Sequence, residues 1–331
     1  MSHESIAVTG ITMGDPAGIG PEIVAKSFAG ENFASRYRAV VIGDEALLAR
    51  AIRLLDLPLR LNAITSPDQA RFEAGVVDLI PTSDLPDDLS FGELDARCGR
   101  AASDYVERAT KLAAGGALDA VCTAPLNKEA LHLAGIKYPG HTEILAGLTG
   151  TKDYAMMLVA PGLRVIHVST HVSLGEAIGR ATTERETTVI RLANDTMKRI
   201  GIEEPRIAVA GINPHAGENG LFGREELEEI LPAINAAKDE GVKVSGPWSA
   251  DTVFVAARRG DFDIVVVQYH DQGHIPIKLL GFESGVNVTV GLPFFRTSVD
   301  HGTAFDIAGK GVADHASLLA ALDLASELAN A

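Results

Sequence analysis

The sequence has little of several features that would assign a protein to a class. Its 331 residues contain two cysteines, Cys98 and Cys122, which are far apart and form no CxxC pair. This argues against a disulfide framework or a structural zinc site and fits a reducing cytoplasm. The N-terminus lacks the basic and apolar regions of a signal peptide, and no apolar run reaches the ~18 residues that a membrane span needs. A cytoplasmic protein with no membrane partner is therefore expected.

Positive charge is also scarce. Lysine and arginine together number 29 against 44 aspartates and glutamates, which gives a net charge of −15. Such a surface repels nucleic acid and anionic lipid, so neither is an expected partner. An anionic substrate would consequently need a local cluster of basic side chains.

The GxGxxG fingerprint of dinucleotide-binding folds is absent from the sequence. The glycine-rich segment 13–22, MGDPAGIGPE, precedes a helical pattern, but its spacing fits neither that fingerprint nor a P-loop. It predicts a tight strand-to-helix turn whose backbone amides face a crevice. The segment 300–311, DHGTAFDIAGKG, predicts a polar loop that could approach a ligand closely at Gly302.

What the sequence does have is a repeated alternation of short apolar runs with longer amphipathic segments. This order predicts an α/β fold of parallel sheets covered by helices. Runs such as 207–212 and 264–267 are apolar throughout, as in strands that are buried on both faces. The predicted strands are 6–13, 39–43, 76–80, 119–123, 154–159, 164–169, 206–212, 242–245, 263–269 and 285–290. The predicted helices include 21–28, 44–54, 101–114, 127–134, 183–200, 224–240, 250–259 and 316–328.

Three of the predicted strands lead into a histidine: His171, His215 and His270. Ligands in such sheets bind beyond the carboxyl ends of the strands, so these imidazoles could converge on one divalent ion and leave positions open for substrate oxygens. The alternative is that each histidine caps a turn or packs against a neighbour. His167 lies inside a predicted strand and reads as structural. The histidines without supporting context are His3, His132 and His315.

A second set of residues is suited to an anion. The sequence PGHTE predicts a turn that opens a helix, where His141 and Thr142 could offer donors to an oxyanion. Lys278, Asn287 and Arg296 come after the third histidine and could supply charge-assisted hydrogen bonds to phosphate or carboxylate. The alternative for the two basic residues is an ordinary solvated position. Their occurrence near the proposed metal ligands of so acidic a chain favours a function.

Taken together, these segments resemble the PdxA family, the 4-hydroxythreonine-4-phosphate dehydrogenases of pyridoxine biosynthesis. The matching stretches are ITMGDPAGIGPE, TAPLNKEAL, YPGHTE, NPHAGE, YHDQG and GLPFFRTSVDHGTAFDIAGKG, and they span nearly the whole chain. The resemblance implies a two-domain α/β/α fold like that of isocitrate and isopropylmalate dehydrogenases, with the active site in the cleft between the domains. It places residues 1–128 and 291–331 in a domain with both termini, and residues 129–290 in a domain for metal, substrate and dimerisation.

The resemblance also implies roles for particular residues. A divalent metal (zinc, cobalt, nickel, manganese or magnesium) would be held by His171, His215 and His270. The substrate would be bound by His141, Thr142, Lys278, Asn287 and Arg296. The adenosine of NAD would be embraced by a loop that contains His301, Gly302, Thr303, Ala304 and Asp306. Lys310 beside that loop would also suit NADP, and the family forms homodimers that share their active sites.

One departure from the vitamin B6 enzymes concerns the substrate. Those enzymes usually follow HDQG with a leucine-proline pair, whereas this chain has HDQGHIPIKLLGF, with an added His274. The run looks closer to the family branch that acts on D-threonate 4-phosphate and D-erythronate 4-phosphate. A third branch acts on aromatic cis-dihydrodiol carboxylates, so the substrate stays open among the three.

The prediction is therefore a metal- and NAD-dependent dehydrogenase that oxidises the C3 hydroxyl of a small phosphorylated hydroxy acid and releases carbon dioxide. The candidates for the proton acceptor, from polar context alone, are Asp251, Asp271 and His274. Two rivals are a metal-dependent phosphohydrolase that uses the same three histidines and a non-enzymatic sugar-phosphate binding protein. Neither accounts for all of the matched segments.

Overall fold

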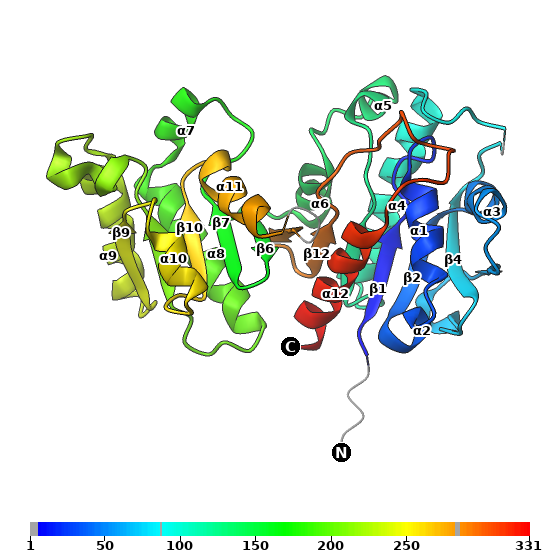
Figure 1. Cartoon of the computed structure of the whole chain (residues 1–331), viewed down its shortest axis with the longest axis horizontal. Coiled ribbons are helices and arrows are strands. Elements are labelled where there is room, and N and C mark those ends of the chain that lie inside the picture. Colours follow the sequence, from blue (N-terminus) through cyan, green and yellow to red (C-terminus); the bar gives the residue numbers. More distant parts are fainter. Residues whose placement is uncertain (1–5, 87, 282–284) are drawn as a thin grey trace, which may run out of the picture. The chain divides into compact units, whose positions relative to one another are not determined.

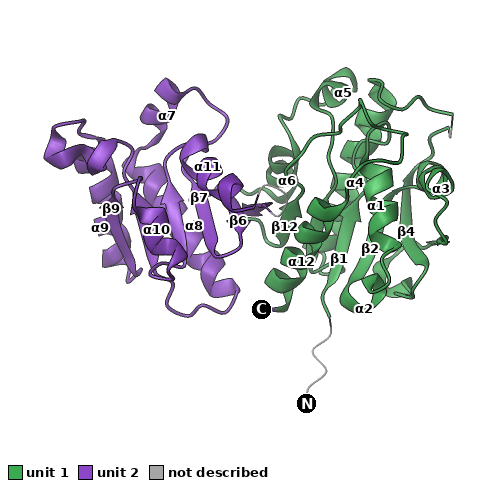
Figure 2. Cartoon of the chain, viewed as in Figure 1, with its two compact units in different colours: residues 1–151, 292–330 green, residues 152–291, 331 purple. Residues whose placement is uncertain are grey.

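The computed structural model describes residues 6–86, 88–281 and 285–331, and Figure 1 shows the elements along the chain. His3 lies outside these ranges. The chain forms two compact units (Figure 2): unit 1 comprises residues 1–151 and 292–330, and unit 2 comprises residues 152–291 and 331. The first junction thus falls after Thr151 rather than at the predicted residue 128, because α5 (Lys128–Leu133) and α6 (His141–Thr149) pack against α4 (Ala96–Ala114).

Unit 1 contains a parallel sheet with the strand order β3-β4-β2-β1-β5-β12. Its strands are β1 (Val8–Thr12), β2 (Arg38–Asp44), β3 (Arg60–Ala63), β4 (Val76–Ser83), β5 (Ala120–Thr123) and β12 (Phe295–Ser298). Its other helices are α1 (Gly20–Phe28), α2 (Phe33–Arg36), α3 (Glu45–Leu54), the 3-10 turn η1 (Pro67–Gln69) and α12 (Ala316–Asn330). Short polar residues begin several of the helices: Asp44 accepts from the Leu47 amide at 3.1 Å before α3, and Asn127 accepts from the Ala130 amide at 3.0 Å before α5.

Unit 2 contains a mixed sheet with the order β11-β6-β7-β10-β8-β9. Its strands are β6 (Ala155–Ala160), β7 (Leu163–His167), β8 (Ile207–Ala210), β9 (Val244–Trp248), β10 (Ile264–Val267) and β11 (Val286–Val290). Its helices are α7 (Leu174–Arg180), α8 (Thr183–Arg199), α9 (Leu231–Asp239), α10 (Val253–Arg258) and α11 (His270–Leu280), with the irregular turns η2 (Pro214–Gly220) and η3 (Glu226–Ile230).

The sheet of unit 2 differs from the predicted all-parallel arrangement. β7, β10, β8 and β9 are parallel, but β6 is antiparallel to both β7 and β11. The reason is a two-residue connection, Pro161-Gly162, in which Gly162 has φ 76°. A proline-glycine pair closes a tight turn, so the chain returns as a hairpin without a crossover helix.

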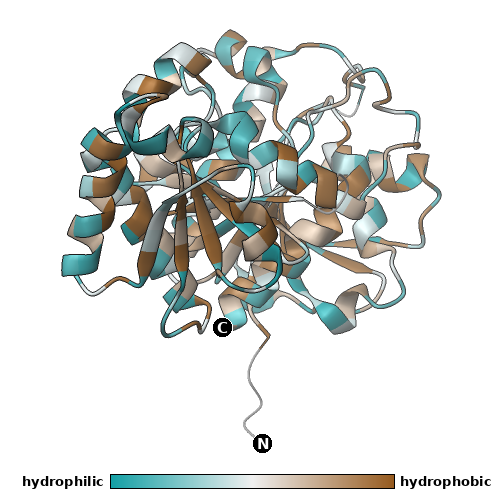
Figure 3. Cartoon of the chain, turned by 60° about the vertical axis from the view of Figure 1, so that its left-hand side comes forward, coloured by the Kyte–Doolittle hydropathy of each residue, from teal (hydrophilic) through white to brown (hydrophobic). Residues whose placement is uncertain are grey.

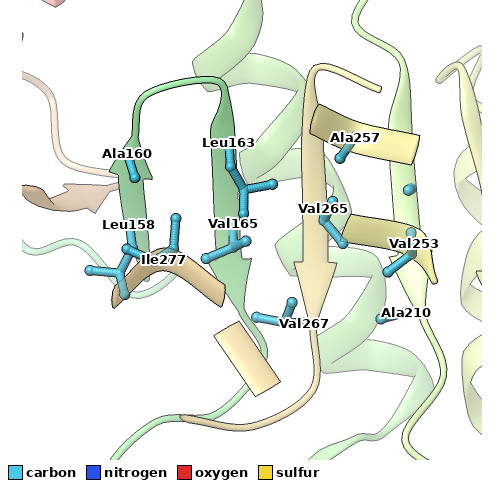
Figure 4. Packing of buried hydrophobic residues seen from close by; sticks show 11 residues of the cluster. Leu158, Ala160, Leu163, Val165, Ala210, Val253, Ala257, Val265, Val267 and Ile277 are labelled. Carbon is cyan, nitrogen blue, oxygen red and sulfur yellow. The ribbon is translucent and has the colours of Figure 1, made fainter. Parts of the chain in front are cut away.

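The core of unit 2 lies where the strands meet their covering helices. Strands β8 and β10 are buried at every position, as their continuous apolar runs predict. In Figure 4, Val165, Val265 and Val267 lie between Ile277 of α11 and Val253 of α10. Figure 3 shows the same division over the chain, with apolar strands and helices that carry hydrophilic residues on their outer sides. Within the described ranges, no helix has both the length and the apolar character needed to cross a membrane.

Candidate active site

The three predicted histidines of unit 2 follow neighbouring parallel strands. β10 pairs in parallel with β7 on one side and with β8 on the other, so the carboxyl ends of the three strands meet at one edge of the sheet. His171 comes shortly after β7, His215 lies in the turn after β8, and His270 is the first residue of α11 after β10. This is the edge at which α/β sheets bind ligands.

Two buried glutamine side chains join these strand ends. The Gln268 amide nitrogen Nε2 donates to the Ala210 carbonyl at 2.9 Å, and Gln272 Nε2 donates to the Gly211 carbonyl at 2.8 Å. Gln272 Oε1 in turn accepts from the Gln268 backbone N–H at 2.7 Å, and Ser169 Oγ donates to the Gln268 carbonyl at 2.9 Å. The backbones that carry the three histidines are therefore tied together by hydrogen bonds inside the protein.

His171 and His270 are brought together. Their ring centroids lie 5.7 Å apart with an angle of 49° between the planes. Nδ1 of His270 lies 2.7 Å from Asp271 Oδ1, which fixes the ring in the tautomer whose Nε2 carries the lone pair. A carboxylate on the far nitrogen of an imidazole is the usual support of a metal ligand. This pair therefore fits a divalent metal, with Asp271 as the supporting group.

His274 lies against the same pair. Its ring stacks on that of His270 at 3.6 Å with an angle of 11°, and its Nδ1 lies 2.9 Å from the His270 carbonyl. His167, at the end of β7, also lies beside His274, at a centroid distance of 4.9 Å. Burial, reinforced by the neighbouring His274, lowers the pKa of His167 to about 3. His167 is therefore neutral and structural, as its place in a strand suggests.

Among the described residues, His215 does not form a group with this pair that could hold a metal. It begins a turn in which His215, Ala216, Gly217, Glu218 and Asn219 all have positive φ, between 42° and 78°. The ring lies near Phe222, with centroids 6.2 Å apart. Across the residues that the structure describes, no three His, Cys, Asp or Glu side chains are grouped so that they could hold a metal ion. Two of the three rings thus lie together and His215 lies in the left-handed turn after β8, so the convergence of three imidazoles on one metal stays a prediction.

The remaining predicted residues of unit 2 are spread over three elements. Lys278 lies two turns beyond His270 on α11, partly buried. Asn287 lies in β11, where its side-chain oxygen is buried without a hydrogen-bond partner among the described residues. Asp251 lies before α10, exposed, and accepts from Ser249 Oγ at 2.6 Å. Asp251 thus serves a local turn, whereas Asp271 and His274 touch His270.

In unit 1 the predicted anion-binding residues lie beside β5. Arg296, in β12, is 3% exposed and donates from Nη2 to Thr123 Oγ1 at 2.6 Å. Burial lowers the pKa of Arg296 to about 10, so the guanidinium stays charged at neutral pH. His141 and Thr142 open α6, as predicted, and the His141 ring has a buried Nε2 with no hydrogen-bond partner in the described chain. Burial, and then the charge of Arg296, hold the pKa of His141 well below its usual range. A buried cation next to a neutral imidazole is an environment that an anion would complete.

The predicted cofactor loop is also part of unit 1. His301, Gly302 and Asp306 are exposed, whereas Thr303 is buried. Ala304 has φ 43°, a conformation that a side chain disfavours, and nothing lies within 4 Å of the place that a Gly302 side chain would take. The loop therefore offers an open backbone and exposed polar groups, which fit a nucleotide.

Comparison with known proteins identifies the chain. Residues 35–325 match the family described as pyridoxal phosphate biosynthetic protein PdxA. The chain belongs to the PdxA family. A D-threonate 4-phosphate dehydrogenase of Cupriavidus necator is 56% identical over 98% of both chains, and a 4-hydroxythreonine-4-phosphate dehydrogenase of Beijerinckia indica is 49% identical over 96% of this chain and 94% of its own. The crystal structure of a 4-hydroxythreonine-4-phosphate dehydrogenase from Burkholderia phymatum superposes with a TM-score of 0.91 at 55% identity, covering 98% of each chain. The predicted two-unit α/β fold of the family is confirmed.

Sequence reasoning missed several residues that shape the site of this PdxA-family chain. Gln268 and Gln272 tie the strand ends, as described above, and two buried glutamates, Glu22 and Glu226, hold loops. A polar residue in an otherwise apolar run is the available signal for Gln268, which directly follows the strand IVVV. Glu22 gives no such signal, because an acidic residue in the first turn of a helix reads as a favourable surface charge.

Proposed function

We propose that this protein is an NAD-linked, divalent-metal-dependent dehydrogenase that oxidises and decarboxylates a 4-phosphorylated 3-hydroxy acid. D-Threonate 4-phosphate and D-erythronate 4-phosphate are the preferred substrates, with 4-phosphohydroxy-L-threonine as the alternative. The observation that carries the proposal is the pair His171 and His270, 5.7 Å apart, with Asp271 holding the His270 ring in a metal-binding tautomer. The names of the similar dehydrogenases give the substrate class.

The metal would be held by His171 and His270, with the third position taken by His215 of the partner subunit. A bound divalent cation would supply Lewis acidity at the substrate hydroxyl, while NAD would accept the hydride. The chemistry of the ligands supports the assignment, because neutral imidazoles suit zinc, cobalt, nickel and manganese. A dimer that shares its active sites follows from this assignment.

The surface around each histidine supports a dimer. Exposed apolar residues follow each of the three histidines along the chain: Leu174 and Ile178 in α7, Leu221 and Phe222 after the His215 turn, and Ile275 and Leu279 in α11. Leu279 is 81% exposed and Leu221 72%. Large exposed apolar side chains close in sequence to polar ligands are typical of a surface that another protein covers. A second copy of the chain, which would bring the missing imidazole, is the occupant that fits.

Other side chains would bind the substrate and accept its proton. Arg296 would pair with phosphate or carboxylate, and His141 and Thr142 would complete that contact. Lys278 and Asn287 are proposed as further ligands of the substrate. For the proton of the C3 hydroxyl, His274 is favoured over Asp251, because its Nδ1 is directed at the His270 carbonyl and its Nε2 is then an acceptor. Bound NAD would supply the acceptor for the C3–H hydride, and the resulting β-keto acid would lose its carboxylate as carbon dioxide and take up a proton at the carbon left behind.

The test is a substrate screen on the purified protein. D-Threonate, D-erythronate and 4-hydroxythreonine 4-phosphates, together with an aromatic cis-dihydrodiol carboxylate, are each offered with NAD or NADP and each of the five metals. With a phosphorylated four-carbon acid, we expect reduced cofactor, measured by its absorbance at 340 nm, and carbon dioxide to form in equal molar amounts. Both products should be lost after the metal is removed with a chelator. Release of inorganic phosphate without absorbance at 340 nm would instead identify a phosphohydrolase. Turnover that persists unchanged in the chelated protein would remove the metal from the reaction.

A further inference from the structure

The glycine-rich segment near the N-terminus, MGDPAGIGPE, has no role in the proposed chemistry, and the structure shows what it contacts. Its end lies directly against the predicted cofactor loop, residues 301–311, within unit 1. The Ile19 N–H donates to the Thr303 carbonyl at 3.1 Å. A side chain on Gly18 would come within 2.9 Å of that carbonyl and of the Thr303 Cβ, so only glycine allows this approach.

The contact continues along α1 with two charged side chains. Glu22 is fully buried, and its carboxylate accepts from two loop amides, Gly309 N–H at 2.6 Å and Gly311 N–H at 2.9 Å. Lys26, one helical turn later, donates to the carbonyls of Gly311 at 2.8 Å and Ala313 at 2.5 Å. One face of α1 therefore holds the end of the loop in two ways. The Glu22 carboxylate accepts from its backbone amides, and the Lys26 ammonium donates to its backbone carbonyls.

The loop end that Glu22 holds has a backbone that would not keep this shape alone. Gly309 and Gly311 have φ of 77° and 69°, which few other residues adopt, and glycine has the largest conformational freedom to lose. A buried carboxylate is stable only when its oxygens are hydrogen-bonded, so its two amides and the fold of the loop depend on each other. Meanwhile the beginning of the loop, at His301 and Gly302, stays exposed.

We propose that Glu22, assisted by Lys26, is a positioning residue that presets the 301–311 loop for the adenosine half of NAD. The inference rests on the proposed function, since it takes the loop to be the cofactor site. Affinity for a ligand falls in proportion to the population of the competent loop, so weakening the hold on the loop weakens NAD binding without touching the ligand. Glu22 does not need to contact NAD for this effect.

The test compares Glu22 with Asp78, a second buried carboxylate of unit 1 that accepts hydrogen bonds from backbone amides. Glu22→Gln replaces one acceptor oxygen by an NH₂ that faces an N–H donor. Asp78→Asn makes the same change at a residue that is 1% exposed and accepts from the amides of Arg71 and Phe72, at 3.0 and 2.9 Å. NAD binding is measured by calorimetry, metal content by mass spectrometry, and loop opening by hydrogen exchange of a peptide that covers residues 301–311.

We expect Glu22→Gln to raise the Kd for NAD about tenfold, with faster exchange in the loop and unchanged metal content. Asp78→Asn should be destabilised to a similar degree but should bind NAD like the wild type. Lys26→Met removes only the two carbonyl contacts and should raise the Kd for NAD by a smaller factor. This variant tests the inference if Glu22→Gln does not fold. Equal NAD affinity in the wild type and in the Glu22 and Lys26 variants overturns the inference alone. A wild-type protein that binds neither NAD nor NADP overturns the proposed function and the inference together.

Discussion

At the scale of single residues, Glu186 of α8 is a buried acid outside the proposed chemistry. It is 0% exposed, and both of its carboxyl oxygens, like Gln268 Oε1, have no hydrogen-bond partner in the described part of the chain. Burial raises the pKa of Glu186 to about 8, against the opposing effects of the Gln268 side chain and of Arg185. The carboxyl of Glu186 is therefore protonated at neutral pH. It lies close to Gln268, whose side chain joins the strand ends.

This gives a prediction for the pH dependence of stability. The folded state holds a proton on Glu186 that the unfolded state loses at a pH near 4.5, so the free energy of unfolding falls as the pH rises from 4.5 toward 8. Glu186→Gln cannot lose a proton. The variant should match the wild type near pH 5 and exceed it by roughly 1 to 3 kcal/mol at pH 8. Urea unfolding of both proteins between pH 5 and 8 measures the difference, and a difference that does not change with pH would contradict the assignment.

The same scale shows how far single residues can be read from a sequence. His171, His270 and the start of α6 at His141 occupy the positions expected after strands and at helix starts, because such positions follow from the alternation of apolar and polar runs. The positions of buried hydrogen-bonding residues such as Glu22 do not follow from that alternation. Glu22 binds amides that lie far along the chain, and nothing local in a sequence marks such a contact.

At the scale of elements, the turn that carries His215 is the most unusual segment in the described chain. Four of its five left-handed residues have side chains, and each such residue costs on the order of 1 kcal/mol. The turn is held by Glu226, which is 2% exposed and accepts from Asn213 N–H at 2.7 Å and from Asn213 Nδ2 at 2.9 Å. A side chain on Gly217 would meet Glu226 Oε2 at 2.6 Å, so the turn also needs glycine there.

We therefore predict that Glu226→Gln releases the turn and with it the metal. Metal content after gel filtration should fall at least about fivefold, because the strained conformation loses its charged acceptor, and the Kd for NAD should stay unchanged. Glu225→Gln is the matched control: Glu225 also accepts from Asn213 Nδ2, at 2.7 Å, but does not bind the Asn213 backbone. It should retain its metal. Full metal content in Glu226→Gln would show that the turn does not depend on this carboxylate.

Elements that the sequence failed to predict have identifiable causes. β12, which carries Arg296, has four residues between loops, too few for a periodic pattern. α11 was missed because Gly273 and Pro276 lie inside it, and both are unfavourable in helix interiors. The hairpin of β6 and β7 was missed although the Pro161-Gly162 pair between two apolar runs is a turn signal. Short elements and those stabilised by tertiary contacts are thus the ones that local patterns do not reveal.

At the scale of the whole molecule, the proposed metal site raises the question of how the pair His171 and His270 would be joined by a third ligand. The exposed apolar residues beside each histidine indicate an answer in self-association. Burying such side chains stabilises a complex by about 25 cal/mol for each Å² removed from water, and an aspartate in their place would be buried without a partner. The assembly and the metal site should therefore be lost together.

Leu279→Asp tests this link, because Leu279 is the most exposed of these residues and lies on the helix that begins with His270. In sedimentation experiments the wild type should have a mass of about twice the 34.8 kDa of one chain, and the variant should have the mass of a monomer. The variant should also lose most of its metal and its turnover while its circular dichroism stays unchanged. Leu54→Asp, an equally drastic change at a 43% exposed leucine of α3 in unit 1, should leave the dimer, its metal and its turnover intact. A wild-type protein that is monomeric and yet holds one tightly bound metal would refute the shared site, since the described part of one chain brings together only two of the three proposed ligands, His171 and His270.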